Sequence, residues 1–386
     1  MEGGGEGTAG VMSRSWKRRA LALADPLVYL LALAISFLLG GLILWAEGSN
    51  PGRDYALMLN GAFGSPFNLG NSLVKAVPVL CTGLAFALAR QAGLINIGAE
   101  GQFLTGGIVG TLVAANVIWL PAAVHVPLAL AGGLVGGGIW GGLAGFMKVR
   151  FRVNEVISTV MLNYVALYLV SYLVNGPMRE PGGNLPQTAP VAASARLAIL
   201  WPGTPFHAGF LVALAAAVAG HLLLFHTVPG FTMRSVGVNR RAAMLNGADV
   251  ARMMSLSMIV SGAVAGLGGI IEIMGVQTRM IANFSSGYGY DGIAVAVIGA
   301  NLPLGTVLAA IFIGALRSGA DLMQLTAAVP IQVVYIVEGA IIILLLCVHT
   351  WLAPIRQQVM RRMAEDDKAA VAREGVVGGV GWTPEP

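Results

Sequence analysis

Charged residues are scarce in this sequence. They make up only 11% of the 386 residues, whereas 56% are hydrophobic, and the mean hydropathy is +0.77. Apolar runs reach about 20 residues, the length that crosses the hydrocarbon core of a bilayer. This composition excludes an ordinary soluble fold and predicts an all-α, polytopic membrane protein.

Lysine and cysteine are also rare, and their positions exclude several functions. The lysines are Lys17, Lys75, Lys148 and Lys368, and none follows a glycine, so the sequence has no Gly-x-x-x-x-Gly-Lys-Ser/Thr phosphate loop. The chain therefore cannot be the ATPase of a powered transporter. Both cysteines lie in apolar runs, and no His/Asp/Glu metal cluster or Ser/Lys constellation recurs at helical spacing within the spans. We expect no metal, no cofactor and no enzymatic activity.

Ten membrane spans fit the apolar pattern, and the eighth is short. They lie at about residues 26–45, 71–89, 94–119, 124–146, 156–174, 207–226, 253–275, 290–300, 304–321 and 328–348. An even number places both termini on one side. Ten spans also divide into five plus five, which allows an inverted repeat, although the two halves share no convincing sequence similarity.

The basic residues orient these spans. With the N-terminus inside, most of the 23 Lys and Arg residues fall on the cytoplasmic side, as the positive-inside rule requires. We expect a basic cytoplasmic tail at residues 1–24, a membrane domain at 25–350 with a cytoplasmic loop at 229–252, and a cytoplasmic tail at 351–386. The predicted location is the bacterial plasma (inner) membrane.

The short eighth span is the first candidate for a functional site. Asp291 lies at its start, and an Asn-Leu-Pro break at residues 301–303 follows it. About 11 helical residues rise only some 16 Å, roughly half a bilayer. Such a segment must be shielded by protein or line a wet cavity. A broken helix beside a central solute path and a simple packing irregularity both fit.

Polar residues also open the third span. Asn96 is a candidate helix cap, and Glu100 would be favoured by the positive end of the helix dipole. Together with Gln102, they equally fit a substrate or gating site, because acidic and amide groups at membrane depth normally face an interior cavity.

The fifth span offers aromatic candidates. Asn154 is a good N-cap, and Asn163 is followed by Tyr164, Tyr168 and Tyr172 at four-residue steps, which place the three rings along one helix face. Such rings stack on a sugar or a nucleobase, or they pack between helices and anchor at the interface. In the tenth span, Glu338 lies near the middle of an apolar run, where either a structural hydrogen bond or a place in the pathway explains it.

The cytoplasmic loop at residues 229–252 predicts a docking helix. Asn239 is its N-cap, and Gly247 supplies the positive φ that commonly ends a helix. Ala242 and Ala243 form a small apolar surface beside Arg240 and Arg241. An ordinary basic loop that only obeys topology rules is the alternative.

At this loop the chain resembles the coupling helix of ABC transporter membrane subunits. The Ala-Ala-x-x-x-Gly spacing matches, but Arg241 replaces the usual Glu. Similar resemblance extends over about residues 26–350, through the segments at 93–102, 153–164, 237–247, 261–266 and 287–296. These segments resemble bacterial ABC importer permeases of the simple-sugar, branched-chain amino-acid and nucleoside group, especially its nucleoside-type members.

The resemblance implies partners that the chain itself lacks. These are a second permease subunit, identical or different, two cytoplasmic ABC ATPase subunits and an extracytoplasmic solute-binding protein, all in a lipid bilayer and without nucleic acid. An ATP-independent channel or secondary transporter remains the second hypothesis, because it would need no ATPase. An intramembrane enzyme is the third and weakest.

Overall fold

The computed structural model describes residues 34–117 and 119–327, together with residues 335–336, 339–340, 343–344, 347 and 358. The chain divides into two units, residues 43–334 and residues 1–42 with 335–386. All the labelled helices belong to the first unit. Glu338, the predicted N-terminal tail, all but residue 358 of the predicted C-terminal tail and most of the predicted tenth span lie outside the described residues.

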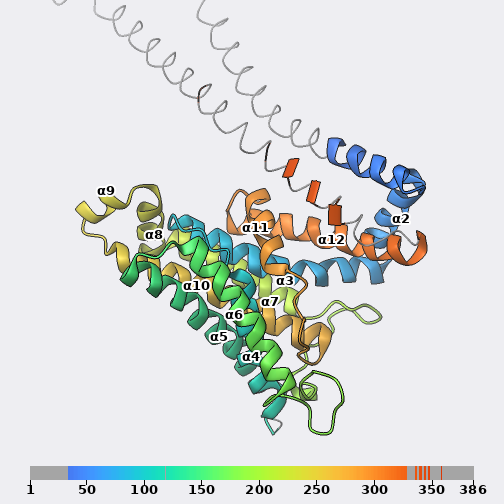
Figure 1. Ribbon diagram of the computed structural model, residues 1–386, viewed down its shortest axis with the longest axis horizontal. Helices are drawn as coiled ribbons and strands as arrows, with labels where there is room; N and C mark the ends of the chain where they lie inside the picture. Colours follow the sequence, from blue (N-terminus) through green and yellow to red (C-terminus); the bar gives the residue numbers. More distant parts are fainter. Residues whose placement is uncertain are drawn as a thin grey trace, which may run out of the picture. The chain divides into compact units, whose positions relative to one another are not determined.

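Every regular element of the described residues is helical, as predicted (Figure 1). In chain order the α-helices are α2 (Pro51–Phe63), α3 (Pro66–Gln91), α4 (Ala99–Asn116), α5 (Ala122–Phe151), α6 (Glu155–Asn175), α7 (Gly209–His226), α8 (Val228–Val238), α9 (Arg240–Leu245), α10 (Val250–Glu272), α11 (Tyr288–Ile298) and α12 (Pro303–Ala327). A π-helical turn, Ile273–Gln277, extends α10.

Six of the described helices are long and apolar enough to cross a membrane: α3, α5, α6, α7, α10 with its π-helical extension, and α12. The chain is therefore a multi-pass membrane protein. α4 and α11 occupy the predicted third and eighth spans, but α4 is less apolar and α11 is short. The described part of the predicted first span is also helical, at Ala34–Ala46.

Two helices were not expected from the sequence. α2 begins after Asn50, whose side chain accepts hydrogen bonds from the backbone N–H groups of Gly52 and Arg53, and Pro51 takes the first helical position. α8 likewise begins after Thr227, whose hydroxyl accepts from Gly230 N. Both segments are rich in residues that are common in turns, so the sequence did not distinguish a helix cap from a turn.

Small residues let α10 pack closely against α5. A Cβ added at Gly137 would stand 2.2 Å from the carbonyl oxygen of Gly262, and one at Gly266 would stand 2.3 Å from that of Gly133. These positions repeat every four residues on both helices, so only glycine permits this approach. The paired glycines in the sequence of α5 are typical of such a packing face.

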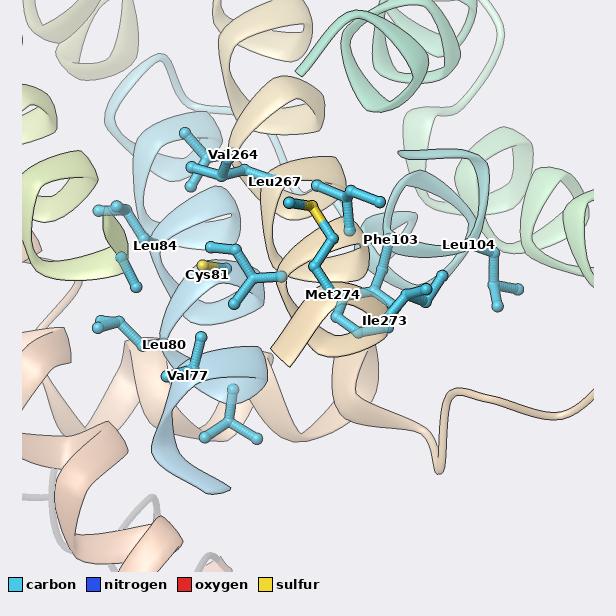
Figure 2. Close-up of a cluster of buried hydrophobic side chains, with 14 of the residues drawn as sticks. Val77, Leu80, Cys81, Leu84, Phe103, Leu104, Val264, Leu267, Ile273 and Met274 are labelled. Carbon is cyan, nitrogen blue, oxygen red and sulfur yellow. The ribbon is translucent and has the colours of Figure 1, made fainter. Parts of the chain in front are cut away.

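The apolar core lies where α3, α4 and α10 meet. Figure 2 shows Leu80, Cys81 and Leu84 of α3 beside Val264 and Leu267 of α10, with Phe103 of α4 nearby. The Phe103 ring stacks on Phe284, at 5.7 Å between ring centroids. α3 is buried along most of its length, which makes it the central helix of this unit.

Candidate solute pathway and coupling helix

The predicted docking helix is present as α9. Asn239 is its N-cap and accepts a hydrogen bond from Ala242 N at 3.0 Å. Gly247 follows the helix with φ +85°, and no atom lies within 4 Å of where its Cβ would stand. Both local expectations are confirmed. Ala243 is buried, whereas Ala242 and Arg241 are exposed, so the helix turns its first-turn charge outward.

α9 is fixed to the rest of the chain at one end of the helical bundle. The Arg240 guanidinium donates to the carbonyl oxygen of Gly93, in the α3–α4 turn, at 2.9 Å. Hollows lie on both sides of α9, one towards α8 and one lined by Lys148 and Arg152. This end, called the α9 end below, therefore presents a shaped and basic surface.

α11 is a half-length helix that reaches the α9 end from the middle of the bundle. Its first residue, Tyr288, accepts a hydrogen bond at its carbonyl from the Thr82 hydroxyl in mid-α3, at 2.8 Å. Just after its last turn, the carbonyl of Asn301 accepts from Gln91 Nε2 at the end of α3. Thr82 and Gln91 are about 14 Å apart along α3. The prediction of a short helical segment at this position is thus confirmed.

Glu100 meets the buried start of α11. Its Oε2 accepts a hydrogen bond from the backbone N–H of Gly289 at 2.7 Å. A Cβ at Gly289 would stand 2.2 Å from Glu100 N, so glycine is needed for this approach. Glu100 also lies in the first turn of α4. Its carboxylate therefore faces the positive ends of two helix dipoles.

Asn96 forms the centre of a buried polar cluster, but it is not the N-cap of α4. That position belongs to Gly98. Asn96 Nδ2 donates to Gln102 Oε1 at 2.8 Å and to Ser261 Oγ at 2.7 Å, and its Oδ1 accepts from Gly98 N at 2.9 Å. The chain makes one more turn after Asn96, so α4 begins later than predicted and its N-cap lies two residues further along, at Gly98.

Asn163 connects α6 to this region. Its Oδ1 accepts from Gly101 N at 2.8 Å, and its Nδ2 donates to the Ile97 carbonyl at 2.9 Å and to the Tyr290 hydroxyl at 3.3 Å. The structure therefore brings together Asn96, Glu100, Gln102 and Asn163, as α4, α6 and α11 meet. Asn154 caps α6 as predicted, accepting from Val156 N.

The tyrosines of α6 point away from the core of this chain. Tyr164, Tyr168 and Tyr172 are 52%, 70% and 66% exposed. The rings are therefore free to meet lipid, a second subunit or solute. Asp291 is placed differently, in an ion pair with Arg317 of α12.

Sequence reasoning missed the partners of these residues. Lys75 and Arg317 lie inside the predicted second and ninth spans, within α3 and α12, but their ion pairs were not predicted, and neither was the contact of the Tyr290 hydroxyl. A basic residue within an apolar span was the available signal for the first two, just as an acidic one was for Glu338. Ser261 gave no such signal, because serine is common in membrane helices.

Comparison with known proteins agrees with this architecture. A family model described as a branched-chain amino acid transport system permease component matches residues 68–346. The glucose ABC transporter permease protein TsgB13 of Haloferax volcanii is 38% identical, over 84% of this chain and 87% of that protein. The guanosine ABC transporter permease protein NupP of Bacillus subtilis is 36% identical, over 83% and 93%.

A third relative is the nucleoside ABC transporter permease protein NupB of Lactococcus lactis, 32% identical over 82% of this chain and 89% of its own length. No solved structure gives a significant match. The family match covers most of the predicted membrane domain, including α9 and α11, so the resemblance inferred from the sequence is confirmed. The chain belongs to the family of branched-chain amino acid transport system permease components, the membrane permease subunits of ABC transporters.

Proposed function

We propose that this permease subunit imports nucleosides, with separate ATPase subunits and an extracytoplasmic binding protein. Two of the relatives are named for guanosine and nucleosides. The exposed stripe of Tyr164 and Tyr168 is the observation in this chain that favours a planar solute. A monosaccharide is the second candidate, because the relative with 38% identity is named for glucose. A branched-chain amino acid is the third, from the family description.

In this proposal the α9 end is cytoplasmic, and α9 docks to an ATPase subunit. Asn239 and Gly247 fix the ends of α9, and the buried Ala243 packs it against the rest of the chain. The exposed Ala242 gives it a small apolar surface, and Arg240 and Arg241 supply charge. Arg240 anchors the helix through Gly93, so a movement of α9 would be passed to the α3–α4 turn. Both termini then lie in the cytoplasm of a bacterial cell, with ten spans arranged as five plus five.

The solute pathway in this proposal runs beside the start of α11. Asn96, Glu100, Gln102 and Asn163 are buried and hydrogen-bonded, so they hold the wall of the pathway in shape. Tyr164, Tyr168 and Asp291 present side chains to it, and Glu338 is assigned to its lining from the sequence alone. The pathway is completed by a second permease subunit, identical or different.

Reconstitution tests this function. The chain is purified in complex with its ATPase subunits, placed in proteoliposomes and supplied with its binding protein. We expect ATP-dependent uptake of radiolabelled guanosine, competed by other nucleosides and not by glucose. Uptake of glucose alone would replace the substrate but keep the importer, whereas solute flux through the purified chain without ATP would support a channel instead.

A further inference from the structure

A short hairpin, residues 197–208, leads into the start of α7. The N–H of Leu200 on its first side donates to the carbonyl of Phe206 on its second side, at 2.8 Å. The four residues at its tip, 201–204, have the sequence Trp-Pro-Gly-Thr. Gly203 has φ +79°, and the N–H of the fourth residue donates to the carbonyl of the first. This is the pattern of a type II turn, so the tip has a defined shape.

The base of the hairpin is buried against the π-helical turn that extends α10. Leu197 N donates to the Met274 carbonyl at 3.3 Å. The His207 ring lies over Gly275, where a Cβ would stand 2.5 Å from the ring nitrogen Nε2. Leu197 and His207 are both buried. The chain itself therefore holds the hairpin at its base.

The tip, in contrast, exposes three large apolar side chains in a row. Ile199, Leu200 and Trp201 are 62%, 43% and 39% exposed. Scattered single apolar residues are ordinary on a protein surface, but a contiguous apolar patch normally marks a surface that meets a membrane or another protein. The tip is such a patch.

The hairpin lies at the end of the bundle opposite α9. A Cβ at Gly70, near the start of α3, would stand 2.9 Å from the Cβ of Thr204 in the hairpin. α3 ends at Gln91, next to the turn that Arg240 of α9 contacts. The helix rises about 32 Å between Gly70 and Gln91, and the hydrocarbon core of a bilayer is about 30 Å thick. With the basic α9 end in water, the hairpin therefore lies at the opposite membrane interface.

The surroundings of the hairpin favour lipid over a soluble partner. The sequence has no Asp, Glu, Lys or Arg from residue 197 to residue 233, whereas protein–protein interfaces carry a polar rim. α7, which follows the hairpin, is strongly apolar, and only 28% of its most apolar stretch is buried. Leu211, in the first turn of α7, is 50% exposed. Exposed apolar side chains thus continue from the tip onto a helix that faces lipid.

We propose that the tip of this hairpin inserts into the membrane interface and anchors the start of α7 there. Trp201 suits the headgroup level, because its ring is apolar while its N–H can still find a hydrogen-bond partner. Ile199 and Leu200 then lie against the acyl chains. The Pro-Gly turn and the buried base fix this shape in advance, so insertion orders little further chain. The inference does not depend on which solute the permease carries.

The accessibility of a spin label in lipid tests the inference. Cys81→Ala and Cys347→Ala remove the native thiols, and Leu200→Cys then carries a nitroxide label at the tip. The full chain is reconstituted in liposomes. Two collision rates of the label are measured, one with oxygen, which concentrates in lipid, and one with a water-soluble nickel chelate.

Two positions on the same chain calibrate the measurement. Leu211→Cys, on α7, is the lipid-facing reference. Leu185→Cys is the matched control for water, because Leu185 is 61% exposed in the loop that carries the Glu180–Arg279 ion pair. We expect the ratio of oxygen to nickel-chelate collision rates to be several-fold higher at the tip than at the water control, and close to the ratio at the lipid reference.

Two results would overturn the inference. A ratio at Leu200→Cys equal to that at Leu185→Cys would place the tip in water. A label protected from both reagents would mean that protein covers the tip, whether a second copy or another part of the chain. If size-exclusion profiles show that Leu200→Cys does not fold, Ile199→Cys gives the same measurement. Since no transport is measured, either negative result leaves the importer assignment in place.

Discussion

The Glu100 carboxylate caps the buried start of α11 by accepting a hydrogen bond from Gly289 N at 2.7 Å. The half-length helix begins inside the bundle, where Gly289 is buried and its N–H group needs a partner within the protein. An acidic residue of α4 therefore fixes the end of a different helix. This explains a carboxylate at membrane depth without requiring that it contact solute.

Substitutions at Glu100 distinguish a role in capping α11 from a role in contacting the solute. Glu100→Gln keeps an acceptor for Gly289 N, so we expect stability and transport close to the parent. Glu100→Leu leaves a buried N–H unsatisfied, which should cost about 1–3 kcal/mol and lower the thermal midpoint in detergent. If the Gln variant is stable but does not transport, the charge of Glu100 acts on the solute, and the capping explanation is insufficient.

The α5–α10 contact predicts opposite effects for two neighbouring glycines. Gly137→Ala places a methyl group 2.2 Å from the Gly262 carbonyl oxygen, which should push the helices apart and destabilise the protein by about 1–3 kcal/mol. Gly138→Ala meets its nearest atom at 3.5 Å, so it should be neutral or slightly stabilising. Thermal unfolding of both variants measures this. Equal midpoints would mean that this close approach does not limit stability.

His207, in the segment before α7, predicts that the stability of the folded chain depends on pH. His207 is buried, its Nδ1 accepts a hydrogen bond from Gly209 N, and burial lowers its pKa to about 4. The folded chain thus resists protonation that the unfolded chain accepts near pH 6.5. The stability from this group is complete above about pH 6.5 and is lost as the pH falls towards 4.

Unfolding between pH 7.5 and 4.5 measures this effect. His207→Asn retains an acceptor for Gly209 N and should reduce the loss of stability at low pH. His226→Asn, at an exposed position, should keep the parent profile. The same pH profile in parent and His207→Asn would show that His207 does not contribute.

The sequence predicted the elements whose local signals were consistent. Asn239 and Gly247 gave α9, Asn154 gave the start of α6, and the break at residues 301–303 gave the half-length α11. It did not predict which distant residues meet, since Asp291 with Arg317 and Asn96 with Ser261 are contacts between helices far apart in the chain. It also missed α2, because Asn50 and Pro51 read equally well as a turn.

The αL position that ends α9 predicts a coupling defect. Gly247→Val forces a β-branched residue into φ +85°, which should shift α9, and Arg241→Glu reverses the charge of its exposed first turn. Both variants should insert normally but lose most co-purification with the ATPase and most solute-stimulated ATP hydrolysis. Gly182→Val, with φ +74° in an open loop remote from α9, imposes similar strain and should couple normally. Normal coupling in both α9 variants would refute the assignment of α9 as the coupling helix.

Substitutions of the exposed Tyr168 distinguish a ring that contacts solute from a ring that anchors α6 in the membrane. If it stacks on a nucleobase, Tyr168→Phe should retain most uptake, because the ring remains, whereas Tyr168→Leu should lose about tenfold in uptake for a stacking loss of about 1–2 kcal/mol. Expression and basal ATPase activity should not change, since the side chain is 70% exposed and supports little of the core. Tyr172→Leu, near the end of the same helix face, is the control and should transport normally. If Tyr168→Leu also transports normally, or if both leucine variants lower expression alike, the stripe anchors α6 in its surroundings and gives no support to a nucleoside.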